Sequence, residues 1–319
     1  MEPKILILMA TYNGEKYIKG QLQSIIKQDY DNWELIVQDD GSSDATCEII
    51  SKYIENDGRI SLQKNTSLYH GAFANYYSLL KQLSSGEFGE KYDYVALSDQ
   101  DDIWDSKRLS HDLKEISSYD EIPCLLYSNY RIIDEDNNVI IPDVNKEIGL
   151  VPTPQETLFF ANAYVWGNTV MFNSKLVAQI NITSRIIKDN HPHDAYLAKV
   201  ALLTGKLRYI DDKLVNYRRF YNNVSADMWY KTNLIGIIKK MSLKKRSKTL
   251  GVTLDQSYFL LKEYNIDKFD DLKNAIEKGR ICGGKYLLNH GIKRKQTLRG
   301  IALYVTFISG IYKKWVKDI

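Results

Sequence analysis

The chain has 319 residues, of which 44% are hydrophobic and 26% charged, so it can bury a large core in one extended domain or in two. Its three cysteines, Cys47, Cys124 and Cys282, lie far apart, which argues against a disulfide framework and a thiolate metal site. The apolar stretch at the N-terminus reads as a strand rather than a signal peptide, and no run reaches the roughly 20 apolar residues that a membrane span needs. We expect a protein of the reducing cytoplasm.

The net charge of +3 hides an asymmetry along the chain. Residues 226–319 hold 20 Lys and Arg against 8 Asp and Glu, a net of +12, which leaves −9 for residues 1–225. Lysine-rich amphipathic patterns also begin near residue 225. We therefore predict a first domain at residues 1–225 and a basic helical C-terminal region at residues 226–319.

The first domain alternates strand-like and helix-like patterns. Strands are predicted at residues 4–10, 33–38, 59–63, 92–99, 169–173, 206–210 and 213–218. Helices are predicted at residues 18–26, 45–54, 71–83 and 193–205. Such alternation predicts an α/β fold with a mostly parallel sheet flanked by helices, whose ligands bind at the carboxyl ends of the strands. The motifs TYNG, DDGSSD and SDQDD each end a predicted strand, so we expect them to converge at one edge of the sheet.

The stretch LSDQDDIW places Asp99, Asp101 and Asp102 within four positions. A solvated loop or a helix N-terminus is the ordinary explanation of clustered aspartates. Here they follow a buried strand, where their mutual repulsion would be costly without a cation, and hard oxygen ligands favour Mg2+ or Mn2+. Magnesium with few protein ligands keeps sites for phosphate oxygens, so a phosphorylated substrate is expected. The chain has neither a Walker loop nor a G-x-G-x-x-G motif, so another nucleotide-binding device is needed.

Four motifs in this order, MATYNG, QDDGSSDAT, LSDQDDIW and HDAYLA, resemble the inverting family-2 glycosyltransferases, which have the GT-A fold. The resemblance covers roughly residues 4–225. The joint occurrence of SDQDDIW and HDAYLA is most similar to the rhamnosyltransferase-like branch of bacteria. The resemblance implies a Rossmann-like mixed, mostly parallel sheet and the transfer of a sugar from a nucleotide-sugar to a hydroxyl group.

The resemblance implies that several residues bind the nucleotide. Thr11 and Tyr12 would line the base and ribose pocket; ordinary packing is the alternative for Tyr12, but its place at the end of a strand favours contact with the base. Asp40 would accept the N3–H of uracil or thymine, which disfavours cytosine. Asp39 would bond the ribose or cap its own turn. Arg218 would lie in a late loop near the diphosphate, where the chain departs from the family pattern because Arg and Phe follow it in place of Gln and His.

The same resemblance implies the metal and catalytic residues. Asp99 and Asp101 form the D-x-D pair, with Asp101 the direct metal ligand, and Asp102 supports them or caps the next helix. Asp194, at the start of the helix HDAYLA, would be the base that deprotonates the acceptor, which is compatible with capping that helix. Gly167 and Asn168 would lie on the acceptor side, or simply form a turn before a strand. The neighbouring histidines, His191 and His193, are interpreted as structural.

The sequence thus predicts a metal-dependent inverting glycosyltransferase that uses Mg2+ or Mn2+. The expected donor is a dTDP- or UDP-sugar, with L-rhamnose the best guess, and the expected acceptor is a growing lipid-linked bacterial surface polysaccharide. Its basic region is expected to bind an anionic membrane at the inner face of the cell membrane rather than nucleic acid. A solvated helical bundle and a homodimer contact are the alternatives for this region. A nucleotidyltransferase and a non-catalytic sugar-nucleotide-binding scaffold are the alternative functions.

Overall fold

The computed structural model describes residues 2–89, 92–152, 154–162, 164–219, 243–292 and 297–319. Contacts divide the chain into two compact units. The first unit comprises Met1–Glu147 and Val165–Phe220, and the second comprises Ile148–Tyr164 and Tyr221–Ile319. Residues 148–164 thus cluster with the C-terminal part, although they lie inside the predicted first domain. The boundary predicted near residue 225 lies outside the described residues.

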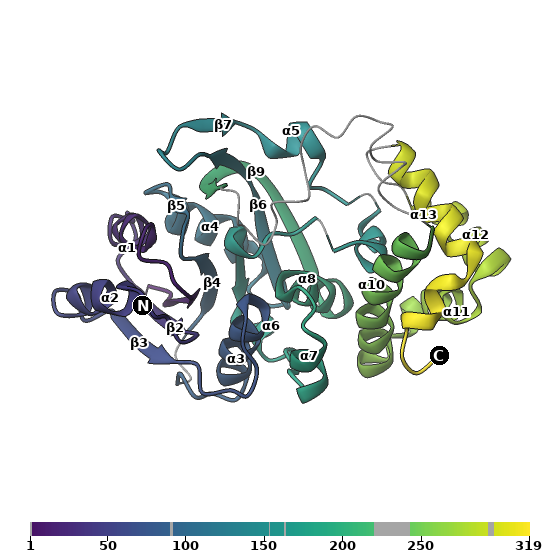
Figure 1. Ribbon diagram of the computed structural model, residues 1–319, viewed down its shortest axis with the longest axis horizontal. Helices are drawn as coiled ribbons and strands as arrows, with labels where there is room; N and C mark the ends of the chain where they lie inside the picture. The colour runs from purple at the N-terminus through teal and green to yellow at the C-terminus, as the bar shows by residue number, and fades with distance from the viewer. Residues whose placement is uncertain (1, 90–91, 153, 163, 220–242, 293–296) are drawn as a thin grey trace. The chain divides into compact units, whose positions relative to one another are not determined.

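The first unit is built on one mixed sheet, in which the described residues form nine strands in the order β3-β2-β1-β4-β8-β6-β9-β5, with β7 paired to β6 (Figure 1). Strands β3, β2, β1 and β4 are mutually parallel, β6 and β9 are parallel to each other, and the other pairs are antiparallel. The strands are β1 (Ile5–Thr11), β2 (Trp33–Asp39), β3 (Ile60–Lys64), β4 (Tyr94–Asp99), β5 (Ile103–Trp104), β6 (Cys124–Ile133), β7 (Val139–Ile141), β8 (Val170–Asn173) and β9 (Lys206–Arg218).

Helices connect and cover these strands. They are α1 (Ile18–Ile26), α2 (Thr46–Ile54), α3 (Ala72–Ser84), α4 (Arg108–Ile116), α5 (Val144–Ile148), α6 (Ser174–Val177), α7 (Ser184–Asp189) and α8 (His193–Thr204). Helices α1 and α2 contact each other, whereas α3 contacts α7 and α8. This arrangement agrees with right-handed crossovers between parallel strands, which place α3 opposite α1 and α2 because β4 lies on the other side of β1.

The predicted fold class is confirmed, and the predicted strands of the first half agree with the structure to within two residues. Several features of the second half differ from the prediction, in which β7, α5, α6 and α7 were also missing. Residues 206–218 form one strand, β9, because a register shift against β6 accommodates the polar pair Asp211 and Asp212. Strand β6 was not predicted, although it is buried along almost its whole length.

The second unit is helical. It contains the short helix η2 (Gln155–Phe160) and the helices α10 (Leu243–Tyr264), α11 (Asp270–Lys278), α12 (Arg280–Asn289) and α13 (Thr297–Ser309). Phe159 and Phe160 of η2 pack against Phe269 and Phe307, and the Ser257 hydroxyl donates a 2.8 Å hydrogen bond to the Phe159 carbonyl. These contacts explain why residues 148–164 cluster with the C-terminal helices. Among the described residues, none of the helices combines the length and the hydropathy needed to cross a membrane.

Gly205 joins α8 to β9 and gives a test of this packing. A Cβ atom there would lie 2.0 Å from the Pro123 carbonyl oxygen, so the backbone would have to move. We expect Gly205→Ala to lower the free energy of unfolding by about 1–3 kcal/mol, because overpacking against a backbone carbonyl costs that much. Urea denaturation measures the change. Gly58→Ala is the control, because a Cβ there meets nothing within 4 Å, and equal stability losses in both variants would contradict the argument.

Candidate active site

The ends of β1, β2 and β4 bring the three polar motifs together, as the sequence predicts. Thr11 at the end of β1 is in register with Asp39 on β2, and Ala10 is in register with Asp99 on β4. The backbone N–H of Asp40 donates a 2.9 Å hydrogen bond to the Thr11 carbonyl. Parallel strands expose their carboxyl ends at one edge, and this register leaves the motifs side by side there.

Gln100, between the two aspartates of the D-x-D pair, fastens the TYNG turn to the acidic motif. Its side-chain carbonyl accepts hydrogen bonds from the Thr11 hydroxyl and the Tyr12 N–H, and its NH2 donates to the Tyr12 carbonyl. A Cβ on Gly14 would overlap this amide, so the glycine is needed for the close approach. The Tyr12 ring is 55% exposed and is free to meet a bound group. Gln100 was not predicted as a site residue.

Asp39 and Asp40 differ in their contacts. The Asp39 carboxylate is buried and accepts hydrogen bonds from the N–H groups of Gly41 and Ser42, both at 2.9 Å, so it caps its own turn. The Asp40 carboxylate accepts from the Gly71 N–H at 2.6 Å and faces the His70 Nδ1 atom at 2.8 Å. For Asp39, the structure therefore favours the turn-capping alternative. Asp40 is oriented by the loop that leads into α3.

The three clustered carboxylates are buried to different degrees and have different partners. Burial raises the pKa of Asp99, whose Oδ1 accepts a 3.0 Å hydrogen bond from the Tyr76 hydroxyl. Burial and the neighbouring Asp99 raise the pKa of Asp101 to about 7. The pKa of Asp102 is raised well above its usual value by burial and by the other two carboxylates. So much buried negative charge is costly unless a cation neutralises it.

Asp102 is a positioning residue rather than a cap of the next helix, which starts at Arg108. Its fully buried carboxylate accepts a hydrogen bond from the Asn168 side-chain NH2 and a 3.0 Å bond from the Arg218 backbone N–H. Asp102 therefore links β4 to the start of β8 and to the end of β9. Asn168 was predicted on the acceptor side, and here it supports the acidic cluster.

The Arg218 guanidinium is itself occupied by protein groups. It donates to the carbonyls of Asp101, at 2.9 Å, and Asp134, at 2.8 Å, and to the Asn137 side chain at 2.6 Å. It also lies over the Tyr17 ring, 4.7 Å from the centroid. Arg218 thus shapes the backbone behind Asp101, and direct contact with a donor diphosphate would require some of these bonds to be exchanged. Phe220, expected beside it, lies outside the described residues.

Asp194 lies in the first turn of α8 and belongs to the same site. Burial raises its pKa to about 7, and the negative charge of Asp99 adds to this shift, so the two carboxylates are near enough to interact. The backbone N–H groups of Ala195 and Gly167 act in the opposite direction. Gly167 therefore lies beside Asp194, on the side where the sequence predicts the acceptor. A carboxylate with a pKa near 7 is suited to general base catalysis.

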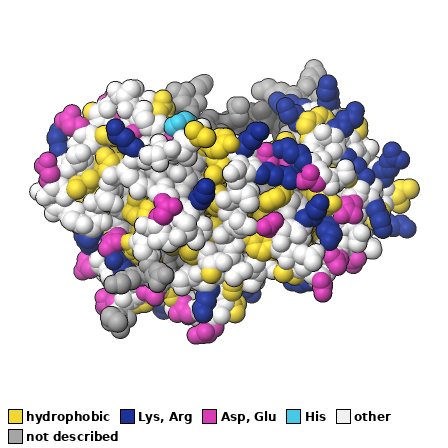
Figure 2. Space-filling model, turned by 90° about the horizontal axis from the view of Figure 1, so that it is seen from below, with side chains coloured by type: hydrophobic (Ala, Val, Ile, Leu, Met, Phe, Trp, Pro, Cys, Tyr) yellow, Lys and Arg dark blue, Asp and Glu magenta, His cyan; other side chains and the backbone are white. Residues whose placement is uncertain are grey.

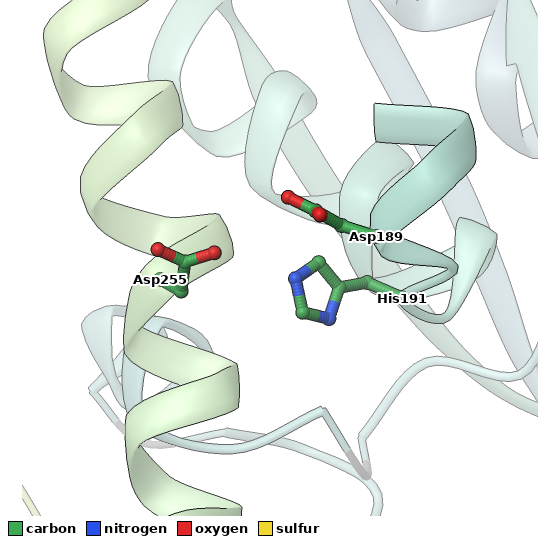
Figure 3. Close-up of side chains that lie close together, drawn as sticks. All are labelled: Asp189, His191 and Asp255. Carbon is green, nitrogen blue, oxygen red and sulfur yellow. The ribbon is translucent and has the colours of Figure 1, made fainter. Parts of the chain in front are cut away.

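A separate group of acidic and histidine side chains is drawn in Figure 3. Asp189 ends α7 and His191 follows it, whereas Asp255 belongs to α10. The first two residues are in the first unit and Asp255 is in the second. We assign no ion site to these three residues.

Solved structures share this fold. The structure of residues 1–349 of Staphylococcus aureus TarS in complex with UDP-GlcNAc is similar over 98% of this chain and 90% of that one, with a TM-score of 0.54 and 16% identity. The mannosyltransferase PcManGT of Pyrobaculum calidifontis, solved with GDP-Man and Mn2+, is similar over 98% of this chain with a TM-score of 0.53 and 15% identity. The fold is therefore of the GT-A type.

Sequence comparison gives the family. The pattern of glycosyl transferase family 2 matches residues 6–177, more than half of the chain, and the chain belongs to this family. It is 27% identical over 261 residues to the dTDP-rhamnosyl transferase RfbG of Shigella flexneri, which covers 78% of this chain and 86% of RfbG. It is 36% identical over 141 residues to the Escherichia coli glucosyltransferase WfgD, 43% of this chain and 49% of that protein. The family resemblance predicted from the four motifs is confirmed.

The donor set at the end of β4 fits a hard divalent cation. Asp99 and Asp101 offer carboxylate oxygens whose charges act on each other in a desolvated place, and Asp102 is already bonded to protein groups. Oxygen ligands of this kind suit Mg2+ and Mn2+. Asp99 and Asp101 would hold such an ion, which would supply positive charge for a bound diphosphate.

Binding of Mn2+ should depend on pH through Asp101. Its pKa is raised to about 7, so protons compete with the ion at pH 6 and much less at pH 8. The pKa of Asp101 is higher in the folded than in the unfolded protein. The metal-free protein therefore loses stability as pH rises from about 4 through 7. A bound ion should restore it. We expect Mn2+ to bind about tenfold more tightly at pH 8 than at pH 6, measured by calorimetry and by the rise in melting temperature.

Asp101→Asn should abolish this pH-dependent response. Asp136→Asn is the matched control, because the Asp136 side chain is exposed to solvent. Equal Mn2+ affinity at both pH values, or an unchanged response in Asp101→Asn, would contradict the assignment of this carboxylate to the metal site.

Proposed function

We propose that this family-2 glycosyltransferase is a metal-dependent, inverting enzyme that moves a sugar from a dTDP- or UDP-sugar to a hydroxyl of a bacterial polysaccharide. One observation carries the proposal: the D-x-D carboxylates and Asp194 belong to the same buried site, where the charge of Asp99 acts on Asp194. A metal-side carboxylate and a carboxylate with a pKa near 7 are the two groups that a single-displacement sugar transfer needs.

The donor is proposed to lie at the ends of β1, β2 and β4. The exposed Tyr12 ring would cover the base, and Asp40 would accept the N3–H of uracil or thymine. Buried carboxylates accept charge-assisted hydrogen bonds strongly, so a base that carries an imide N–H is favoured. The predicted contacts of Thr11 and Asp39 with the nucleotide stay predictions, because both side chains are engaged within the protein.

In the proposed transfer step, Asp194 is the general base. The acceptor oxygen attacks the anomeric carbon from the face opposite the leaving group, the carbon–oxygen bond to the diphosphate breaks, and the acceptor proton passes to the Asp194 carboxylate. A divalent ion at Asp99 and Asp101 would offset the charge on the departing diphosphate. The backbone N–H of Gly167 beside Asp194 orients this carboxylate.

The proposed donor sugar is L-rhamnose, supported by the similarity to RfbG over most of both chains. The proposed acceptor is a lipid-linked glycan, supported by the name of WfgD, which acts on a diphosphoundecaprenol-linked sugar. Incubation with Mn2+ and a panel of nucleotide-sugars, followed by measurement of released dTDP and UDP, tests the donor. Release from no donor, with a panel of lipid-linked acceptors present, would favour the scaffold alternative.

Two substitutions should separate metal binding from proton transfer. Asp194→Asn should lower kcat by about 10²–10⁴, the usual contribution of a general base, and change the donor Kd by less than about threefold. Asp101→Asn should also remove transfer, but by weakening the Mn2+-dependent binding of the nucleotide. Donor titration and single-turnover transfer measure the two effects. If either variant keeps wild-type kcat and donor affinity, that residue does not have the proposed role.

The second unit is proposed to dock on an anionic membrane at the cytoplasmic face, and α12 and α13 carry the evidence. Ile301, Val305 and Ile308 are exposed along one stripe of α13, and Ile281 and Leu288 along one stripe of α12. The two stripes meet, because the Ile308 side chain occupies the space beside Gly284, where a Cβ would lie 2.9 Å from it. Exposed aliphatic groups on adjacent helices form an apolar patch, which is unusual on a soluble surface.

Basic residues lie on or next to the helices that carry this apolar patch. Arg280 and Lys285 lie on α12, and Lys314 follows α13; all three are exposed. Figure 2 shows Lys and Arg side chains gathered in the part of the view that Figure 1 assigns to α10–α13. Apolar side chains flanked by cations suit the headgroup region of an anionic bilayer, where each Lys or Arg contributes about 1 kcal/mol.

Vesicle flotation of the full-length protein tests this surface. The wild type should float with vesicles that contain phosphatidylglycerol and much less with pure phosphatidylcholine. Ile301→Ser combined with Val305→Ser should weaken the partition about thirtyfold, since each loses roughly 1 kcal/mol of apolar burial. Val139→Ser combined with Ile140→Ser is the matched control, because these β7 residues are equally exposed in the first unit. The proposal would be contradicted if the Ile301→Ser, Val305→Ser variant floats like the wild type. It would also be contradicted if the wild type dimerises and never floats.

A further inference from the structure

The first residue of α8, His193, has an unusual environment. Its side chain is 5% exposed, and among the described residues both ring nitrogens lack a hydrogen-bond partner. The ring is stacked on Tyr76 of α3, with 4.0 Å between centroids and 21° between planes. Burial of two unpaired ring nitrogens costs free energy, so this position is not optimised for stability alone.

The Tyr76 ring connects His193 to the acidic cluster. The Tyr76 hydroxyl lies 2.6 Å from the Ser98 carbonyl oxygen and 3.0 Å from Asp99 Oδ1. Tyr76 is buried, and its position is set by α3, which packs on both β1 and α8. One end of the stacked pair is therefore fixed to the metal-side carboxylate.

Gly167 closes the other end of the stack. A Cβ on Gly167 would lie 2.7 Å from His193 Nε2 and 3.3 Å from Cε1. The backbone angle φ of Gly167 is not positive, so its lack of a side chain matters for space and not for conformation. The His193 ring thus lies between the Tyr76 ring and the Gly167 backbone. Asn168 follows this glycine and donates a hydrogen bond to Asp102. Residues 167 and 168 therefore contact both His193 and the acidic cluster.

We propose that Tyr76, His193 and Gly167 act as a positioning stack that sets the separation between Asp99 and Asp194. The inference rests on the proposed function, in which Asp99 serves the donor side and Asp194 the acceptor side. His193 precedes Asp194 directly, and Gly167 contacts both residues, so any shift of the His193 ring moves the Asp194 carboxylate. None of the three residues needs to touch the substrate for this role.

A double-mutant cycle between Gly167 and His193 tests the stack. Gly167→Ala should lower kcat about tenfold or more, with the donor KM within about threefold, because misplacement by 1 Å has effects of that size. His193→Asn removes the ring and frees the space. In that background Gly167→Ala should cost less than about twofold, so the two effects are not additive. Gly20→Ala is the control glycine, since a Cβ there meets only one atom within 4 Å, at 3.9 Å.

Tyr76→Phe keeps the stacked ring and removes the hydroxyl that contacts Asp99 and the Ser98 carbonyl. It should lower kcat about 5- to 20-fold while lowering the melting temperature by only a few degrees, which provides a test even if Gly167→Ala does not fold. Wild-type kcat in Gly167→Ala or in Tyr76→Phe, or an equal cost of Gly167→Ala in both backgrounds, would overturn the stack while leaving the proposed function intact. A wild type that transfers no sugar would overturn the proposed function instead.

Discussion

Buried negative charge at the carboxyl end of β4 is the constraint on which the rest of the site depends. Asp99, Asp101 and Asp102 follow a strand that is buried through Leu97, so their charges cannot be left to solvent. Hydrogen bonds offset part of the free-energy cost of this buried charge. Asp99 accepts one from a tyrosine hydroxyl, and Asp102 accepts one from a side-chain amide and one from a backbone N–H. Asp101 is the carboxylate that a divalent ion would relieve most.

The same constraint joins the two halves of the sheet. In the proposed function, the parallel strands β1 to β4 would present the nucleotide side, whereas β8, β9 and α8 would present the acceptor side. Asp102 is bonded to residues at the start of β8 and at the end of β9, so the acidic cluster holds the second half in place.

Several site residues were predictable because local sequence carries their signal. Alternating strands and helices indicate that the motifs after β1, β2 and β4 meet, and the register of Thr11 with Asp39 shows that they do. Contacts between distant segments were not predictable. Gln100, Asn168 and Tyr76 are ordinary residue types, and nothing in their neighbours along the chain indicates that they face the TYNG turn, Asp102 and Asp99.

The sequence by itself determined the order of the elements from β1 to β4, the clustering of carboxylates after a buried strand and the family to which the chain belongs. Those features depend on local periodicity and on short motifs, which are fixed by neighbouring residues. The tertiary structure alone decided that Asp39 caps its turn, that Arg218 binds backbone carbonyls behind Asp101, and that residues 148–164 pack with the C-terminal helices. These outcomes depend on which partners long-range packing brings within hydrogen-bonding distance, and sequence spacing does not encode such distances.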